Sequence, residues 1–233
     1  MHVSALWRYP VKSMRGEELT SVALTSDGVP GDRVVHVRGS RGPLTGRTRH
    51  GLLTLPVATS PDGTPLIDDH DWRSAEALSL VHERAGDDAD LVADDTAQRF
   101  DVLNLLVVTD GAVQRLGRDV RRLRPNLVID GVPDGDELSW PGKALAIGNA
   151  LIGVDSLRAR CIVTTIDPDS GDQDLDVLRE IRRDFGGELG FNCWVIRPGV
   201  VAVGDEVRLV TTDAVPDTYG GWIVGAPYPH REG

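Results

Sequence analysis

The sequence predicts an α+β fold that is mainly β, a barrel-type sheet with short helices and a smaller barrel-like region before it. Short apolar runs dominate the chain, and glycine, proline and aspartate separate them, which is typical of strands joined by turns. Only one segment has a strong helical period. No glycine-rich fingerprint opens a helix and no Walker-type loop is present, so a dinucleotide or P-loop fold is not indicated.

The N-terminal part of the chain consists of short β-like segments. Residues 27–32, Asp-Gly-Val-Pro-Gly-Asp, form a predicted turn between two of them. The strands predicted here are residues 3–9, 19–24, 34–37, 51–58 and 64–67. Residues 86–96 are acidic and poor in large apolar side chains, which favours a solvated connection near a domain boundary. The pattern therefore predicts a first β-rich region over residues 1–85.

The C-terminal part begins with an apolar run at residues 102–108, interrupted only by Asn104, as expected of a buried strand. Thr109 and Asp110 can cap a short helix over residues 111–116. Residues 174–185 are the clearest helix, since apolar residues recur every three to four positions and Gly186 and Gly187 follow. Further strands are predicted at residues 127–129, 144–154, 193–197, 200–203 and 207–210, with 193–197 and 200–203 paired around Pro198 and Gly199. This region spans residues 95–211, and residues 212–233 are predicted to form a poorly packed extension.

Composition excludes several classes of protein. The formal net charge of −11 argues against nucleic acid as the main partner, because phosphate backbones require a basic surface. No apolar run is long enough to span a bilayer, and the N-terminus does not resemble a signal peptide, so a cytoplasmic location without a membrane partner is expected. Two cysteines cannot hold a four-cysteine zinc site or iron–sulfur cluster, and a disulfide framework is not expected.

The strongest local signal for chemistry is Cys161, which follows Arg160 and precedes Thr164, Thr165 and Asp167. A neighbouring arginine stabilises a thiolate, which is both a nucleophile and a soft metal ligand. The threonines and the Asp-Pro turn offer hydroxyls and oriented amides nearby. By itself the segment leaves open that Cys161 is an inert buried cysteine, which is the commoner fate of such a residue.

Basic residues cluster locally on this acidic chain, which suggests a site for a small anion. Arg118, Arg121, Arg122 and Arg124 fall within seven residues and lead into Asn126, and arginine forks suit phosphate. A second basic group comprises Arg41, Arg47 and Arg49. A third segment, residues 9–14, supplies Lys12 and Ser13. The alternative interpretation of each is an ordinary solvated basic turn.

Taken together, the ordered motifs resemble the MOSC superfamily, named for the C-terminal domain of molybdenum-cofactor sulfurases. Residues 1 to about 85 resemble a shortened form of its N-terminal β-barrel domain. Residues 95–211 resemble the MOSC domain itself. The motifs that carry the resemblance are Tyr9-Pro10-Val11-Lys12-Ser13, Gly31-Asp32-Arg33, Leu44-Thr45-Gly46-Arg47, residues 106–110, residues 121–128, residues 142–148, Arg160-Cys161 to Gly171 and residues 203–207.

Within this superfamily the pattern is most similar to the mitochondrial amidoxime-reducing component and its bacterial counterparts. The resemblance implies that Cys161 ligates molybdenum beside the pterin dithiolene, and is thereby catalytic. It also implies contacts to the cofactor from Lys12, Ser13, Arg33, Arg47, Thr109, Arg122, Arg124, Asn126 and Arg160.

The resemblance therefore implies a molybdenum-cofactor oxidoreductase that reduces N-hydroxylated or N-oxide small molecules. No ferredoxin-like domain follows the MOSC-like region, so the electrons would come from a separate ferredoxin- or flavin-type reductase. Two other functions fit the same residues. Cys161 could carry a persulfide as a sulfurtransferase, or the protein could bind the cofactor as a non-catalytic carrier.

Overall fold

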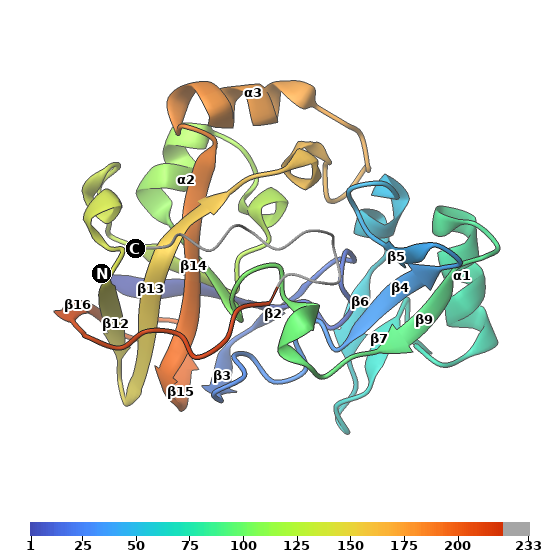
Figure 1. The fold of residues 1–233 in the computed structure, drawn as a ribbon, viewed down its shortest axis with the longest axis horizontal. Helices are drawn as coiled ribbons and strands as arrows, with labels where there is room; N and C mark the ends of the chain where they lie inside the picture. Colours follow the sequence, from blue (N-terminus) through green and yellow to red (C-terminus); the bar gives the residue numbers. More distant parts are fainter. Residues whose placement is uncertain (221–233) are drawn as a thin grey trace. The chain divides into compact units, whose positions relative to one another are not determined.

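The computed structural model describes residues 1–220, and their chain divides into two compact units that are interleaved in sequence. Unit 1 comprises residues 1–8, 18–30 and 104–217, and unit 2 comprises residues 9–17 and 31–103 together with the segment that begins at residue 218. Each unit is described by itself below. Figure 1 shows the chain coloured along the sequence.

Strands predominate over helices in both units, which confirms the mainly-β α+β fold class (Figure 1). The strands are β1 (His2–Arg8), β2 (Glu17–Leu19), β3 (Ser21–Leu24), β4 (Val35–Gly39), β5 (Gly42–Leu44), β6 (Val57–Thr59), β7 (Pro65–Ile67), β8 (His70–Asp71), β9 (Asp90–Ala93), β10 (Leu105–Thr109), β11 (Leu127–Asp130), β12 (Lys143–Ile147), β13 (Ala150–Ala159), β14 (Glu188–Arg197), β15 (Gly199–Ala202) and β16 (Val207–Thr211). The helices are α1 (Ala75–Ala85), α2 (Asp110–Leu116) and α3 (Leu175–Asp184), with 3-10 turns η1 (His50–Thr54), η2 (Ala97–Arg99), η3 (Val120–Leu123), η4 (Asp136–Ser139) and η5 (Ile162–Thr165).

The main sheet has the strand order β16-β12-β13-β14-β10-β11-β1-β2. Its ends approach closure, because His2 of β1 forms a single bridge to Glu206 and the Val3 amide donates to the Asp205 carbonyl at 2.9 Å. The Val207 amide also donates to the Met1 carbonyl at 2.9 Å, and the Gly204 amide donates to the Val3 carbonyl at 2.8 Å. These bonds do not make β16 and β1 neighbours in the sheet, so the predicted barrel is not completely closed. Its core is apolar and includes Leu127, Ile152 and Phe191, which are almost fully buried.

Two helices cover a second apolar cluster in unit 1. The helix α3 begins where the sequence predicts, since the Asp174 side chain accepts a hydrogen bond from the Asp176 amide. Val177 and Ile181 are fully buried and pack in the same cluster as Ala112 of α2. The chain therefore places both helices against the β10–β11 region, which positions the turns that follow them.

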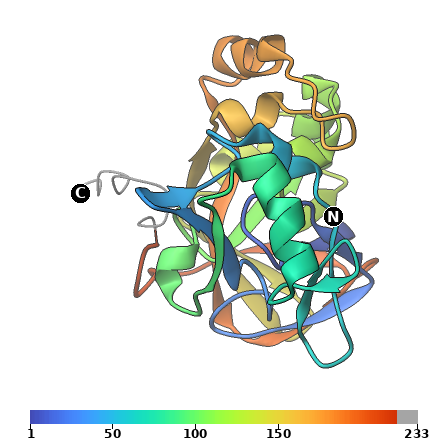
Figure 2. The same cartoon turned by 90° about the vertical axis from the view of Figure 1, so that its right-hand side faces the viewer.

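Unit 2 is built from two three-stranded sheets, β5-β4-β9 and β6-β7-β8, and the helix α1. The helix faces the viewer in Figure 2 and buries Ala77, Val81 and Ala85 in the core of this unit. The sequence-based prediction missed α1, whose buried face consists of small side chains. It also assigned residues 86–96 to a solvated connection, which is wrong for residues 90–93, because they form β9 and pair with β4.

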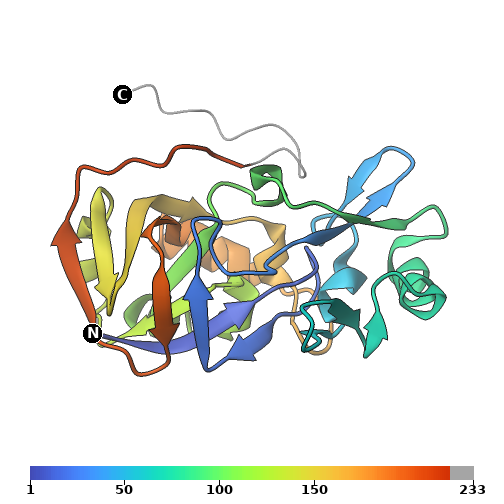
Figure 3. The same cartoon turned by 90° about the horizontal axis from the view of Figure 1, so that it is seen from below.

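Two further strand predictions are wrong in detail. Residues 51–54 belong to the 3-10 turn η1, so only residues 57 and 58 of the predicted 51–58 strand lie in a strand, β6. The predicted hairpin around Pro198 and Gly199 does not form, because β15 pairs with β3 instead of β14 (Figure 3). Proline at 198 lacks the amide that would continue a ladder, and the chain leaves its sheet there. Residues 221–233 of the predicted extension lie outside the described residues.

None of the helices in residues 1–220 is long and apolar enough to cross a membrane.

Candidate functional site

Cys161 lies in unit 1 at the junction between β13 and the turn η5, where it occupies the N-cap position. Its backbone carbonyl accepts hydrogen bonds from the Thr164 amide at 3.1 Å and from Thr164 Oγ1 at 2.9 Å. These bonds fix the backbone of Cys161, while its thiol is free and half-buried. The thiol is thus held by a defined backbone and is available to a ligand.

The second cysteine has a different environment. Cys193 lies on β14 and its side chain is fully buried in the core of the main sheet. Burial raises the pKa of the Cys193 thiol well above its usual range, which keeps it in the neutral form. Of the two cysteines, only Cys161 is therefore suited to metal ligation or nucleophilic chemistry.

The threonines after Cys161 support the turn instead of pointing free hydroxyls at a ligand. Thr164 Oγ1 is bound to the Cys161 carbonyl, and Thr165 Oγ1 donates to the Ile162 carbonyl at 2.6 Å. Thr165 Oγ1 also accepts a hydrogen bond from Gln173 Nε2 at 3.1 Å. Both residues are almost fully buried. The expectation that their hydroxyls face a ligand is therefore replaced by a structural role.

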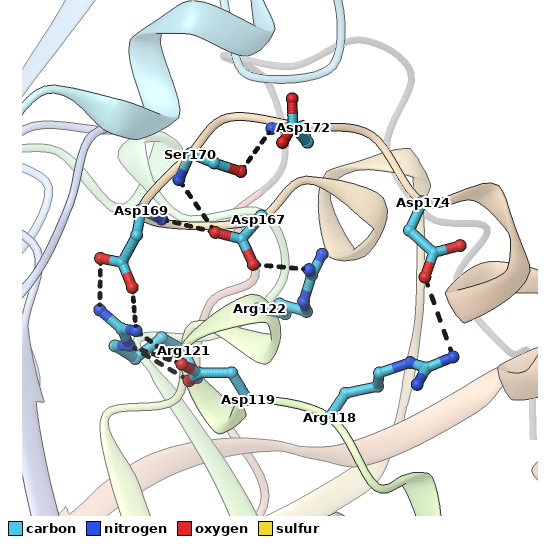
Figure 4. A network of polar contacts seen from close by, with 9 residues as sticks. All are labelled: Arg118, Asp119, Arg121, Arg122, Asp167, Asp169, Ser170, Asp172 and Asp174. Atoms are coloured by element: carbon cyan, nitrogen blue, oxygen red, sulfur yellow. Dashed lines mark hydrogen bonds and ion pairs between the residues drawn. The ribbon is translucent and has the colours of Figure 1, made fainter.

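Asp167 organises the loop that follows η5 (Figure 4). Its Oδ1 accepts hydrogen bonds from the amides of Asp169 at 2.9 Å and Ser170 at 3.0 Å. Its Oδ2 pairs with Nη2 of Arg122 at 2.8 Å. These backbone amides, followed by the Arg122 charge, lower the pKa of Asp167 below its usual range. The carboxylate therefore stays ionised and ties the Cys161 loop to η3.

Arg122 has a buried side-chain nitrogen without a hydrogen-bond partner in the described chain, as does Arg118 at its Nε. The Arg122 side chain is 10% exposed, and η3, which carries it, packs against η5. Nη2 is paired with Asp167, but Nη1 is buried and has no hydrogen-bond partner among the described residues. A buried donor without an acceptor is costly, so an anionic group next to Nη1 would be stabilised.

The other two arginines drawn in Figure 4 are neutralised by carboxylates of the same unit. Arg121 pairs with Asp119 and with Asp169, both at 2.6 Å, which raises the pKa of its guanidinium further above the ordinary value. Arg118 pairs with Glu180 at 2.9 Å and lies 3.8 Å from Asp174. These carboxylates offset the positive charge of Arg118 and Arg121, so the cluster carries less net positive charge in the fold than its sequence suggests.

The remaining predicted contacts of unit 1 are Asn126, Arg160, Arg124 and Thr109. Asn126 bridges strands, since its Oδ1 accepts from the Leu106 amide at 3.0 Å and its Nδ2 donates to the Trp7 carbonyl. Arg160 Nη2 donates to the Leu123 carbonyl at 2.6 Å. Arg124 ends η3 with a φ of 56°, in the left-handed region. Thr109 is buried at the start of α2. Asn126 and Arg160 thus support the strands and η3.

In unit 2, Lys12 and Arg47 converge on Asp101. Lys12 is buried, and its Nζ donates to Asp101 Oδ1 and to the Arg99 carbonyl, both at 2.7 Å. Nη2 of Arg47 lies 3.8 Å from Asp101 Oδ2. Two predicted cofactor contacts therefore share one carboxylate, which sequence reasoning missed because Lys12 and Asp101 are 89 positions apart.

Arg33 and Ser13, also in unit 2, adopt left-handed backbone conformations with φ of 57° and 67°. Arg33 pairs with the fully buried Asp32, and its guanidinium stacks over the Tyr9 ring at 5.0 Å. Asp32 also accepts a hydrogen bond from the Tyr9 amide at 2.7 Å. Arg33 is thus part of a local structural cluster, and Ser13 lies on a constrained turn.

Comparison with known proteins identifies the two regions of the chain. Residues 1–98 match the model of the MOSC N-terminal beta barrel domain, and residues 109–208 match the model of the MOSC domain. The chain belongs to the MOSC family. The resemblance deduced from the sequence motifs is thereby confirmed, and both domains occur in the expected order.

Individual relatives of this MOSC protein fall into two groups. Molybdenum cofactor sulfurase 2 of Culex quinquefasciatus is 38% identical over 90 residues, which cover 39% of this chain and only 12% of the sulfurase. Mitochondrial amidoxime-reducing component 1 of Homo sapiens is 26% identical over 280 residues, which cover 89% of this chain and 82% of the human protein. The chain therefore spans a small part of the sulfurases but most of the amidoxime-reducing component.

Among solved structures, the YUAD protein from Bacillus subtilis is similar with a TM-score of 0.47 and 16% sequence identity, covering 91% of this chain and 97% of that protein. The family membership of this chain rests on the two sequence models.

Proposed function

We propose that this protein binds the molybdenum cofactor and reduces N-hydroxylated or N-oxide small molecules with electrons from a separate protein. The observation that carries the proposal is Cys161, a free and half-buried thiol on a turn that packs against the turn bearing Arg122. A thiolate is a soft ligand suited to molybdenum, and the unpaired buried Nη1 of Arg122 suits an anionic group of the pterin. The donor set therefore fits the cofactor.

The amidoxime-reducing component supports the choice of reaction, since this chain aligns with most of its length. When bound, the cofactor would supply the two-electron chemistry that cleaves the N–O bond. In the net reaction, R–NHOH takes up two electrons and two protons and yields R–NH2 and water. Cys161 would hold the metal, while the ion pair of Arg122 and Asp167 would keep the Cys161 loop in place.

Further parts of the proposal follow from the motifs. Lys12, Ser13, Arg33 and Arg47 of unit 2, and Thr109, Arg124, Asn126 and Arg160 of unit 1, are proposed contacts to the pterin or its phosphate. A ferredoxin- or flavin-type reductase would be the electron donor. We place the reaction in the cytoplasm, with no nucleic-acid or membrane partner.

A second candidate is sulfur transfer by a Cys161 persulfide. The matches to molybdenum cofactor sulfurases favour it, because they reach 38% identity, and so does the availability of the Cys161 thiol. This function requires a persulfide donor, whose outer sulfur bonds to the Cys161 thiolate as the donor's own thiolate leaves, and an acceptor to which that sulfur then moves. A third candidate, cofactor delivery, requires binding without turnover.

One purification separates these functions. The protein is produced in cells competent in cofactor synthesis, and molybdenum and pterin are measured together with Cys161→Ala and the matched control Cys193→Ala. We expect about one molybdenum per chain, retained in Cys193→Ala with unchanged coordination, and an altered metal environment without turnover in Cys161→Ala. A metal-free and pterin-free wild type would overturn the proposal. A persulfide on Cys161 would support sulfur transfer, and bound cofactor without reduction of N-hydroxylated compounds would support delivery.

A further inference from the structure

A cavity of about 160 Å³ lies within unit 1, between α2, η4 and the N-terminal half of β14. Its walls are mainly aliphatic and aromatic and include Ala112, Phe185 and Phe191. An apolar cavity of about 150 Å³ is large enough to hold benzene. The space therefore accommodates a ligand with one small ring.

Glu137 introduces a nearly buried carboxyl group into this apolar wall. Its residue is 6% exposed, and Oε2 accepts a hydrogen bond from the Gly135 amide at 3.0 Å. The backbone amide of Glu137 itself also interacts with this carboxyl group. Burial raises the pKa of Glu137 above its usual value, because a charged carboxylate is poorly solvated there. A carboxyl group so placed gains most from a ligand that donates a charged hydrogen bond.

Thr109 provides a second buried polar atom in the lining. The residue is 1% exposed, and its Oγ1 is buried without a hydrogen-bond partner in the described chain. Thr109 stands at the N-cap position of α2, yet its side chain makes no capping bond. The Thr109 hydroxyl does not cap α2 and is thus available to a ligand as a hydrogen-bond donor or acceptor.

The charges around the cavity are predominantly negative. Asp134, Glu137, Asp184 and Glu188 line it, and Arg115 is the single basic lining residue. The guanidinium of Arg115 is a cation that is bound at this wall by a carboxylate and an aromatic ring. It pairs with Asp134 at 3.3 Å and lies 4.5 Å above the Phe185 ring. The electrostatics therefore select a cation over an anion.

We propose that this cavity binds a small primary ammonium compound with one ring, its apolar body against the aromatic walls and its nitrogen at Glu137 and Thr109. An ammonium group has three donors and no acceptor, which matches a carboxyl group and the unpartnered Thr109 Oγ1. Pairing with a buried carboxylate offsets the desolvation of a cation only where further hydrogen bonds are made, and Thr109 Oγ1 can supply one. Thr109 is also a proposed contact to the pterin, but Ala112 and Glu137 are not, so Ala112→Leu and Glu137→Gln test this site separately from the proposed function.

The test uses isothermal titration calorimetry on the full chain with benzylammonium as the probe. Benzyl alcohol and benzoate provide neutral and anionic comparisons of nearly the same shape. We expect one saturable site for benzylammonium, with at least tenfold weaker binding of the alcohol and no binding of benzoate. The variants are Glu137→Gln, Thr109→Val and Ala112→Leu, and the matched control is Asp136→Asn, the exposed neighbour outside the lining.

Glu137→Gln should weaken benzylammonium binding at least tenfold, Thr109→Val should weaken it several-fold, and Asp136→Asn should leave it unchanged. Ala112→Leu fills the cavity and should abolish binding, which keeps the test decisive if Glu137→Gln does not fold. The proposal is overturned if benzylammonium shows no saturable binding at concentrations up to about 10 mM, since a Kd of that size corresponds to a binding free energy of only ~2.7 kcal/mol. Equal affinity for benzyl alcohol, or full affinity in folded Ala112→Leu, overturns it as well.

Discussion

The ion pair between Arg122 and Asp167 is expected to control the local stability of the Cys161 loop, and Asp167→Asn tests this directly. The substitution removes the negative charge but keeps an oxygen that can accept the amide hydrogen bonds of Asp169 and Ser170. The Arg122 side chain is 10% exposed and that of Asp167 33%, so the pair lies between two reference cases. Exposed pairs contribute about 0.2–1 kcal/mol, and loss of one partner from a buried pair costs about 3–5 kcal/mol.

An intermediate value of about 1–2 kcal/mol follows, which corresponds to roughly a 5–30-fold change in the opening equilibrium. Amide hydrogen exchange of residues 162–174 measures this opening locally, without requiring the whole chain to unfold in one step. We expect exchange in Asp167→Asn to be faster by that factor over this segment and unchanged over β12. The control is Asp176→Asn, because the Arg179–Asp176 pair is exposed at 70% and 65%.

Exchange that accelerates less than twofold in Asp167→Asn would refute the assignment of Asp167 as the anchor of the loop. Equal acceleration in Asp176→Asn would show a general charge effect instead. The pH dependence gives a second check with a definite sign. Since the pKa of Asp167 is lowered in the fold, its stabilisation is present above the ordinary aspartate pKa of about 3.9 and is lost as pH falls below it.

Two further predictions concern the units themselves. His36 is 5% exposed with both ring nitrogens unpartnered in the described chain, and burial lowers its pKa from 6.5, so acid should destabilise unit 2 as pH falls below that value. His36→Leu should remove this part of the pH dependence in urea unfolding, and an unchanged dependence would contradict it. In Gly153→Ala the new Cβ would lie 2.3 Å from the Trp194 ring, so urea unfolding should show a loss of about 1–3 kcal/mol, and an unaltered midpoint would be the contrary result.

The sequence predicts best those elements whose signal is local. Helix α3 carries its apolar period, its Asp174 cap and its terminal glycines within fourteen residues, and it forms within a residue of the predicted bounds. The buried strand β10 is likewise marked by one continuous apolar run. Helix α1 and strand β9 were missed because their burial depends on partners elsewhere in unit 2, which local composition does not reveal.

The candidate site divides in the same way. The motif around Cys161 identifies the cysteine and the family, because both depend on contiguous residues. The partners of the basic residues could not be predicted, since Arg122 and Asp167 are 45 positions apart and Lys12 and Asp101 are 89. Only the tertiary fold brings these charged residues together, so the local sequence does not indicate which carboxylate pairs with which basic side chain.

The pairing of arginines with carboxylates changes how the basic cluster at residues 118–124 can bind an anion. On a chain with net charge −11, acids outnumber bases, and both Arg118 and Arg121 are paired to them. An incoming anion would therefore meet little net positive potential and would depend on individual donors. Nη2 of Arg122 pairs with Asp167 of the Cys161 loop, and its Nη1 is buried without an acceptor in the described chain. A single side chain thus joins the geometry of the Cys161 loop to the binding of an anion, so occupancy of the anion site and order of the loop should be coupled.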